Sequence, residues 1–151
     1  MTTTDPTTIE VDQFYPHAPA KVWRALTEPE LIAQWMMPGD FRLEVGHRYT
    51  MQGRAMPATG FSGVVQAEVL DFDLEKLLRI AWRDAAADSP VAAADWTITW
   101  TLEPEGTGTR LFLLHEGFDP DDPLQRQAHT IMSGGWRTGV ASALAKTLDS
   151  I

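Results

Sequence analysis

The chain has 151 residues, which is long enough for one domain with a substantial buried core. Its hydrophobic fraction of 44% and charged fraction of 22% are ordinary for a soluble globular protein. The formal net charge of -9 argues against partners such as nucleic acid or an anionic membrane surface, because both need clustered Lys and Arg.

Several further classes are excluded by composition. No segment approaches the roughly 18 consecutive apolar residues that span a bilayer, so we expect no membrane insertion. The first residues, MTTTDPTT, lack the basic and apolar regions of a signal peptide. Because there is no Cys, neither disulfides nor thiolate chemistry is available. We therefore expect a cytoplasmic protein with one domain over residues 8–151 and a flexible polar tail over residues 1–7.

The first two elements are a strand and a short helix. The sequence IEVDQFY, which begins at Ile9, alternates apolar and polar residues and predicts a strand. The sequence PHAP interrupts it, and Pro19 suits the first turn of a helix whose apolar residues are Val22, Trp23 and Leu26.

A second short helix follows in LTEPELIAQWMMPG. Thr27 and Glu30 have the spacing of a capping box, in which each side chain satisfies a free backbone donor of the other. Leu31 and Trp35 are four residues apart and share one helix face. The sequence PG then ends the helix.

From residue 41 onward the apolar residues follow period two. Residues 41–45, 49–51 and 78–82 alternate and predict strands. Residues 63–72 are apolar on both faces, so either face could turn inward. Residues 52–62 are typical of a loop.

Two further strands are predicted near the end of the sheet. Residues 96–102 are the clearest, because Trp, Ile and Leu alternate with Thr. Residues 111–118 form the last strand and turn His115 inward. Phe112 and Leu114 face the other side, where they predict either a homodimer contact or a surface covered by the chain's own N-terminal segment.

The last part of the chain predicts a long helix. Its apolar residues recur from Leu124 to Ile151 in steps of three and four, which gives one continuous apolar stripe. Gly134, Gly135 and Gly139 interrupt it, and each costs about 1 kcal/mol relative to Ala. Such a cost indicates either that another group packs closely against the helix at these glycines or that they leave space for another group. A long helix with one apolar stripe must lie across a sheet, so the fold class is α+β, with room for a cavity between helix and sheet.

Four segments carry a resemblance to a known family: APAKVWRALTEPELIAQW, EVGHRYTMQG, GTRLFLLHEGF and GGWRTGVASALAKTL. Together they resemble the SRPBCC (START-like, Bet v 1-like) superfamily, and within it the proteins similar to the activator of Hsp90 ATPase homologue 1, over about residues 8–150. The resemblance implies a helix-grip fold, in which about six to seven curved antiparallel strands surround the long C-terminal helix, with two short helices after the first strand. This chain differs at Met36 and Met37, where relatives often place a second aromatic residue, and at Gly46-His47, where many have Gly-Gly.

The resemblance also implies a hydrophobic cavity for a small apolar or aromatic ligand, lipid-like or polyketide-like. Aromatic residues at period two are more often plain core, and that alternative stays open. Met36 and Met37 are the best candidates for ligand selectivity. The predicted cavity residues are Trp35, Met36, Met37, Phe41, Tyr49, Met51, Trp82, Trp96, Ile98, Trp100, Leu113, His115, Met132 and Trp136.

The sequence offers little for catalysis. The four His residues lie far apart with no ligand spacing, so we expect no metal site and no cofactor. His115 is the one candidate acid or base, and the alternative is a core His with a satisfied ring. Some superfamily relatives are cyclases, dehydratases or hydrolases, which makes a cavity enzyme the second hypothesis. Chaperone (Hsp90) binding is the third, although the eukaryotic activator uses an additional domain.

Overall fold

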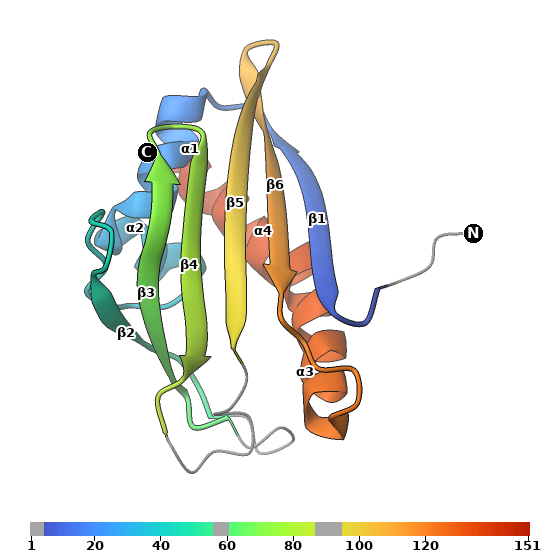
Figure 1. The fold of residues 1–151 in the computed structure, drawn as a ribbon. Helices are drawn as coiled ribbons and strands as arrows, with labels where there is room; N and C mark the ends of the chain where they lie inside the picture. Colours follow the sequence, from blue (N-terminus) through green and yellow to red (C-terminus); the bar gives the residue numbers. More distant parts are fainter. Residues whose placement is uncertain (1–4, 56–60, 87–94) are drawn as a thin grey trace.

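A computed structural model describes residues 5–55, 61–86 and 95–151. Figure 1 shows a sheet with the C-terminal helix running across one face. The strands are β1 Thr8–Tyr15, β2 Arg48–Gln52, β3 Val64–Asp73, β4 Leu77–Asp84, β5 Trp96–Glu105 and β6 Gly108–Glu116. The helices are α1 Pro19–Thr27, α2 Pro29–Trp35, α3 Pro123–Gly134 and α4 Ala141–Asp149, and a π-helical segment, Gly135–Val140, joins the last two.

The six described strands form one antiparallel sheet in the order β1-β6-β5-β4-β3-β2. The C-terminal helix covers its inner face, and α1 and α2 lie on that same side, where both contact α4 (Figure 1). This is the expected α+β helix-grip fold, with two short helices after the first strand.

The core follows from period two in the strands. On β5, Trp96, Ile98, Trp100 and Leu102 are all at most 6% exposed and face the helix. The ambiguous strand β3 is also settled: its residues at 65, 67 and 69 are buried and those at 66, 70 and 71 are exposed.

The strand predicted over residues 41–45 is wrong. Residues 41–45 belong to no strand, and the nearest pairing before them is an isolated bridge from Gly39 to Met51. Residues 42–47 instead make local turn bonds, from Glu44 N–H to the Arg42 carbonyl and from His47 N–H to the Glu44 carbonyl. The chain then bonds to β3, from the Gly46 N–H to the Val69 carbonyl at 2.8 Å and from the Val69 N–H to the His47 carbonyl at 3.0 Å. The described residues therefore form a sheet of six strands.

The predicted capping box is also wrong. Helix α1 continues through Thr27, whose hydroxyl donates to the Trp23 carbonyl at 2.7 Å. Glu28 is the single extended residue between the helices and is the N-cap of α2, without a side-chain capping bond. The predicted shared face is confirmed: Leu31 and Trp35 are both buried, and the Trp35 indole donates to the Ala25 carbonyl at 2.8 Å.

Part of the predicted flexible tail has defined contacts. The backbone N–H and hydroxyl of Thr7 both donate to Asp5, and the Phe118 N–H donates to the Thr7 carbonyl at 3.2 Å. Residues 1–4 lie outside the described residues, as do residues 56–60 of the predicted loop and 87–94 of the connection before β5. No helix in the described ranges is long and apolar enough to cross a membrane.

Phe112 and Leu114 lie half-buried on the outer sheet face. Their neighbours across β1 are Asp12 and Glu10. The described N-terminal segment pairs beside β6 as an edge strand and does not lie over this face (Figure 1). Within the described residues, the chain therefore does not cover Phe112 and Leu114 in the way that one alternative supposed.

Candidate functional site

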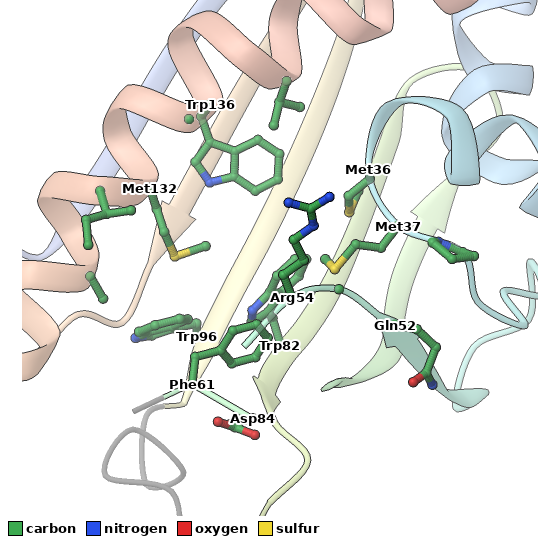
Figure 2. Close-up of a pocket in the computed structure, with 16 residues that line it drawn as sticks. Met36, Met37, Gln52, Arg54, Phe61, Trp82, Asp84, Trp96, Met132 and Trp136 are labelled. Atoms are coloured by element: carbon green, nitrogen blue, oxygen red, sulfur yellow. The ribbon is translucent and has the colours of Figure 1, made fainter. Parts of the chain in front are cut away.

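A pocket of about 570 Å³ opens between the sheet and the C-terminal helix, next to the end of α2 (Figure 2). That volume falls in the ordinary range for small-molecule sites. The sheet contributes the end of β4 and the start of β5, and the chain leaving β2 forms one rim. Most of the wall is apolar.

Four aromatic residues form much of the wall. Trp82 and Trp96 come from adjacent strands, Trp136 comes from the π-helical segment, and Phe61 precedes β3. The rings of Trp82 and Trp136 meet edge to face, with centroids 6.3 Å apart. The three Trp residues are at most 7% exposed, so neighbouring side chains fix the ring orientations.

Three methionines complete the apolar lining from two sides. Met36 and Met37 follow α2, and Met132 lies across the pocket on α3 (Figure 2). A Cβ on Gly53 would stand 2.7 Å from the Met37 sulfur, so glycine at 53 leaves Met37 room beside the strand end. Unbranched, polarizable methionine side chains adapt to ligands of different shape.

One face of the C-terminal helix lines the pocket. Its members recur in steps of three and four and are Ala128, Ile131, Met132, Gly135, Trp136 and Val140. A Cβ at Gly135 would meet no atom within 4 Å. Of the two explanations for a glycine here, space beside the helix therefore applies, because no other group packs closely against it. Gly134 and Gly139 are exposed and do not line the pocket. Short π-helical segments such as this one recur at functional sites.

His115 lies behind the wall. It is fully buried, and its Nδ1 accepts a hydrogen bond from the Trp136 indole at 3.1 Å. Its Nε2 then carries the proton and has no hydrogen-bond partner among the described residues. Its ring packs against Phe118 and Trp96, with centroids 4.6 and 5.2 Å away. Burial, together with the nearby His129, lowers the pKa of His115 to about 3. The imidazole is therefore neutral, and it orients Trp136.

Among the described residues, three polar side chains line the pocket: Gln52, Arg54 and Asp84. Asp84 is 6% exposed, and its carboxylate accepts hydrogen bonds from the Ser62 N–H at 2.9 Å, the Ser62 hydroxyl and the Ala86 N–H at 3.0 Å. The sequence predicted none of the three as site residues. Gln52 and Arg54 sit where a strand passes into a loop, and period two says nothing about side-chain direction there.

The fourteen predicted cavity residues fall into three groups. Six lie on the pocket wall: Met36, Met37, Trp82, Trp96, Met132 and Trp136. Trp35, Trp100 and Leu113 border a second space of only about 20 Å³, too small for an organic ligand. The others are buried without lining either space: Phe41, Tyr49, Met51, Ile98 and His115.

The division has a steric reason. Trp35 and Trp100 meet edge to face with centroids 6.2 Å apart, and Trp100 also contacts Trp136 at 6.2 Å. Large rings thus fill the sheet-helix space where Trp35, Trp100 and Trp136 meet. The pocket lies on the other side of Trp136, where Met36, Met37 and Met132 line it. Among the described residues, no group of three or more His, Asp or Glu could hold a metal ion.

The chain is similar to known proteins in both sequence and fold. The family model for activator of Hsp90 ATPase homolog 1-like proteins matches residues 16–149. The crystal structure of protein MLL2253 from Mesorhizobium loti is 35% identical, with a TM-score of 0.81, covering 95% of this chain and 97% of that one. No curated protein matches the chain.

Two more distant structures share the fold alone. CalU16 from Micromonospora echinospora is 22% identical, with a TM-score of 0.72, covering 93% of this chain and 75% of that one. DynU16, a protein of the dynemicin biosynthetic locus, is 20% identical with a TM-score of 0.75. The match covers 97% of this chain but 48% of DynU16.

Proposed function

This chain belongs to the activator of Hsp90 ATPase homolog 1-like family, and from that premise we propose that it binds one small apolar, aromatic molecule in the pocket between sheet and helix. The observation that carries the proposal is a pocket of about 570 Å³ walled by Phe61, Trp82, Trp96 and Trp136. Ligand sites are typically apolar and concave with few polar groups, as here.

The wall favours a flat ligand. Rings fixed on three sides offer edge and face contacts to an aromatic guest, each worth about 0.5–1.5 kcal/mol beyond burial. The methionines at the other side can adjust to its outline. A lipid-like or polyketide-like ring system fits this description. DynU16, which shares this fold, is a protein of the dynemicin biosynthetic locus.

Binding is favoured over catalysis by the position of His115. It lies behind Trp136 and Trp96, and it is not among the described residues that line the pocket. An acid or base must come within hydrogen-bond reach of the proton that it moves. His115 therefore acts in this proposal by orienting the Trp136 ring.

The test is a fluorescence titration with the neutral aromatic probe N-phenyl-1-naphthylamine. Gly135→Leu places a side chain in the pocket, and we expect it to weaken probe binding at least about 10-fold, which is roughly 1.4 kcal/mol. Gly139→Leu is the matched control, since it makes the same change at an exposed site off the wall. It should bind the probe as the wild type does.

Two results would contradict the proposal. One is a wild-type protein that leaves the probe unbound. The other is equal affinity for wild type and Gly135→Leu, because the probe would then be bound elsewhere. Thermal unfolding of each variant establishes that a lost signal is not lost fold.

A further inference from the structure

Arg54 is the one cationic residue among the described residues of the pocket wall. Figure 2 shows its guanidinium directed toward the part of the pocket where Met36 and Trp136 lie. No carboxylate of the described residues is within ion-pair distance of Arg54. By contrast, five other arginines form ion pairs: Arg24, Arg42, Arg48, Arg83 and Arg110.

The backbone that carries Arg54 is fixed in place. The Gln52 N–H donates to the Pro38 carbonyl at 2.9 Å, and the Gly53 N–H donates to the Gly63 carbonyl at 2.6 Å. A Cβ on Gly63 would stand 2.8 Å from the Ala55 nitrogen and 3.2 Å from the Arg54 carbonyl carbon. Gly63 also has φ +98°, which favours glycine. The two segments can therefore cross closely, and the crossing positions Arg54 at the rim.

The acidic residue of the wall does not neutralise this cation. The Asp84 carboxylate is engaged by Ser62 and Ala86, as described above. Figure 2 shows it beyond Phe61, away from the Arg54 guanidinium. Asp84 thus organises the Ser62 loop, and the charge presented to a guest comes from Arg54.

We propose that the guest carries an anionic group, a carboxylate, sulfonate or phosphate, on its apolar aromatic body, and that Arg54 binds that group. This inference rests on the proposed function, because it assigns the charge of the molecule in the same pocket. A guanidinium pairs with such anions through two parallel hydrogen bonds. The pairing is stronger beside apolar walls than in water. A local cation is also needed because the net charge of -9 disfavours anions at longer range.

The test compares two probes with one skeleton. 8-Anilinonaphthalene-1-sulfonate carries a sulfonate, and N-phenyl-1-naphthylamine is the same ring system without it. For Arg54→Gln we expect sulfonate affinity to fall about 10-fold, the loss typical of a charge-assisted hydrogen bond, with affinity for the neutral probe within about 2-fold. Arg42→Gln makes the same charge change at an exposed arginine away from the pocket and should alter neither.

Ionic strength provides a second readout. Added salt should weaken sulfonate binding to the wild type and have less effect on Arg54→Gln. Gly135→Leu should also weaken sulfonate binding, and equal sulfonate affinity for wild type and Gly135→Leu would refute an anionic guest in this pocket.

The outcomes separate the two proposals. If both probes bind the wild type but Arg54→Gln weakens both equally or neither, the anionic guest is refuted and the aromatic pocket stands. If the neutral probe does not bind the wild type, the proposed function fails and the anionic guest with it. A sulfonate loss that Arg42→Gln reproduces also refutes a role for Arg54, because net charge would explain it.

Discussion

The pair of His115 and Trp136 shows how a buried polar residue can shape an apolar wall. Trp136 must turn one ring face to the pocket while its N–H finds an acceptor, since an unpaired buried donor costs about 1–3 kcal/mol. His115 lies on β6, the strand beneath the helix, and its Nδ1 is the acceptor, 3.1 Å from the Trp136 indole nitrogen. The unpaired Nε2 is the cost of this arrangement, which is consistent with a ring held for orientation.

This residue also predicts a pH dependence of stability. Burial lowers the pKa of His115 from 6.5 to about 3, so between these values the unfolded chain binds a proton that the folded chain does not. Stability contributed by the neutral ring is therefore complete above pH 6.5 and is lost as pH falls toward 3. We expect roughly 2 kcal/mol of unfolding free energy to be lost between pH 7.5 and 5.0 through this group.

Urea unfolding at the two pH values measures the effect. His115→Gln keeps an acceptor for Trp136 but has no titrating ring. Its loss of unfolding free energy between pH 7.5 and 5.0 should therefore be smaller than that of the wild type by about 2 kcal/mol. His47→Gln, which removes a surface imidazole bonded to the Asp40 carbonyl, is the control and should keep the wild-type loss. Equal losses for wild type and His115→Gln would show that the buried ring does not set the dependence.

At the scale of elements, the C-terminal helix separates stability from binding. Gly134 and Gly135 both have helical backbone angles, and a Cβ at either would meet no atom within 4 Å. Gly134→Ala should therefore raise the unfolding free energy by about 0.5–1 kcal/mol. Because Gly134 is exposed and off the pocket wall, affinity for N-phenyl-1-naphthylamine should not change. Chemical denaturation and probe titration of this one variant measure both, and a loss of stability would refute the open-space explanation.

The sequence predicted best those strands in which the alternation of apolar and polar residues matches the alternation of inward and outward positions. On β5, Trp and Ile alternate with Thr over a full strand, so period two identified the inner face. Residues 41–45 show the same alternation, but Glu44 bonds back to Arg42 and His47 bonds back to Glu44 in turns. Only hydrogen-bond partners distinguish the two cases. The Thr27 and Glu30 spacing misled for a related reason: α1 extends one residue beyond Leu26, the last residue of its apolar pattern, so Thr27 is already helical.

At the scale of the molecule, the sequence could predict a sheet-helix interior but not which part of it is open. Trp35, Trp100 and Trp136 all point inward, so the sequence pattern predicts each of them equally well as a cavity-lining residue. Their edge-to-face contacts fill one end, which moves the pocket to the ends of β2 and β4 and the start of β5. Packing of three rings from three separate elements depends on distances, and one-dimensional periodicity carries no distances between elements. Arg54 was missed because it lies where β2 passes into a loop, and period two gives no side-chain direction there.

This placement predicts that an occupant stabilises the whole fold. A guest in the pocket contacts β4, β5 and the C-terminal helix at once, so it binds the folded chain and not the unfolded one. At ten times its Kd, N-phenyl-1-naphthylamine should add about 1.4 kcal/mol, which corresponds to a rise in Tm of roughly 3–5 °C for a chain of this size. Differential scanning fluorimetry is unsuitable with a fluorescent probe, so circular dichroism at 222 nm should follow the melt. For Gly135→Leu, whose Kd we expect to be at least about 10-fold higher, the same probe concentration should add at most about 0.4 kcal/mol, a rise in Tm of no more than about 1.5 °C. Gly139→Leu should rise like the wild type. An equal rise in all three proteins would mean that the probe stabilises the fold from outside the pocket.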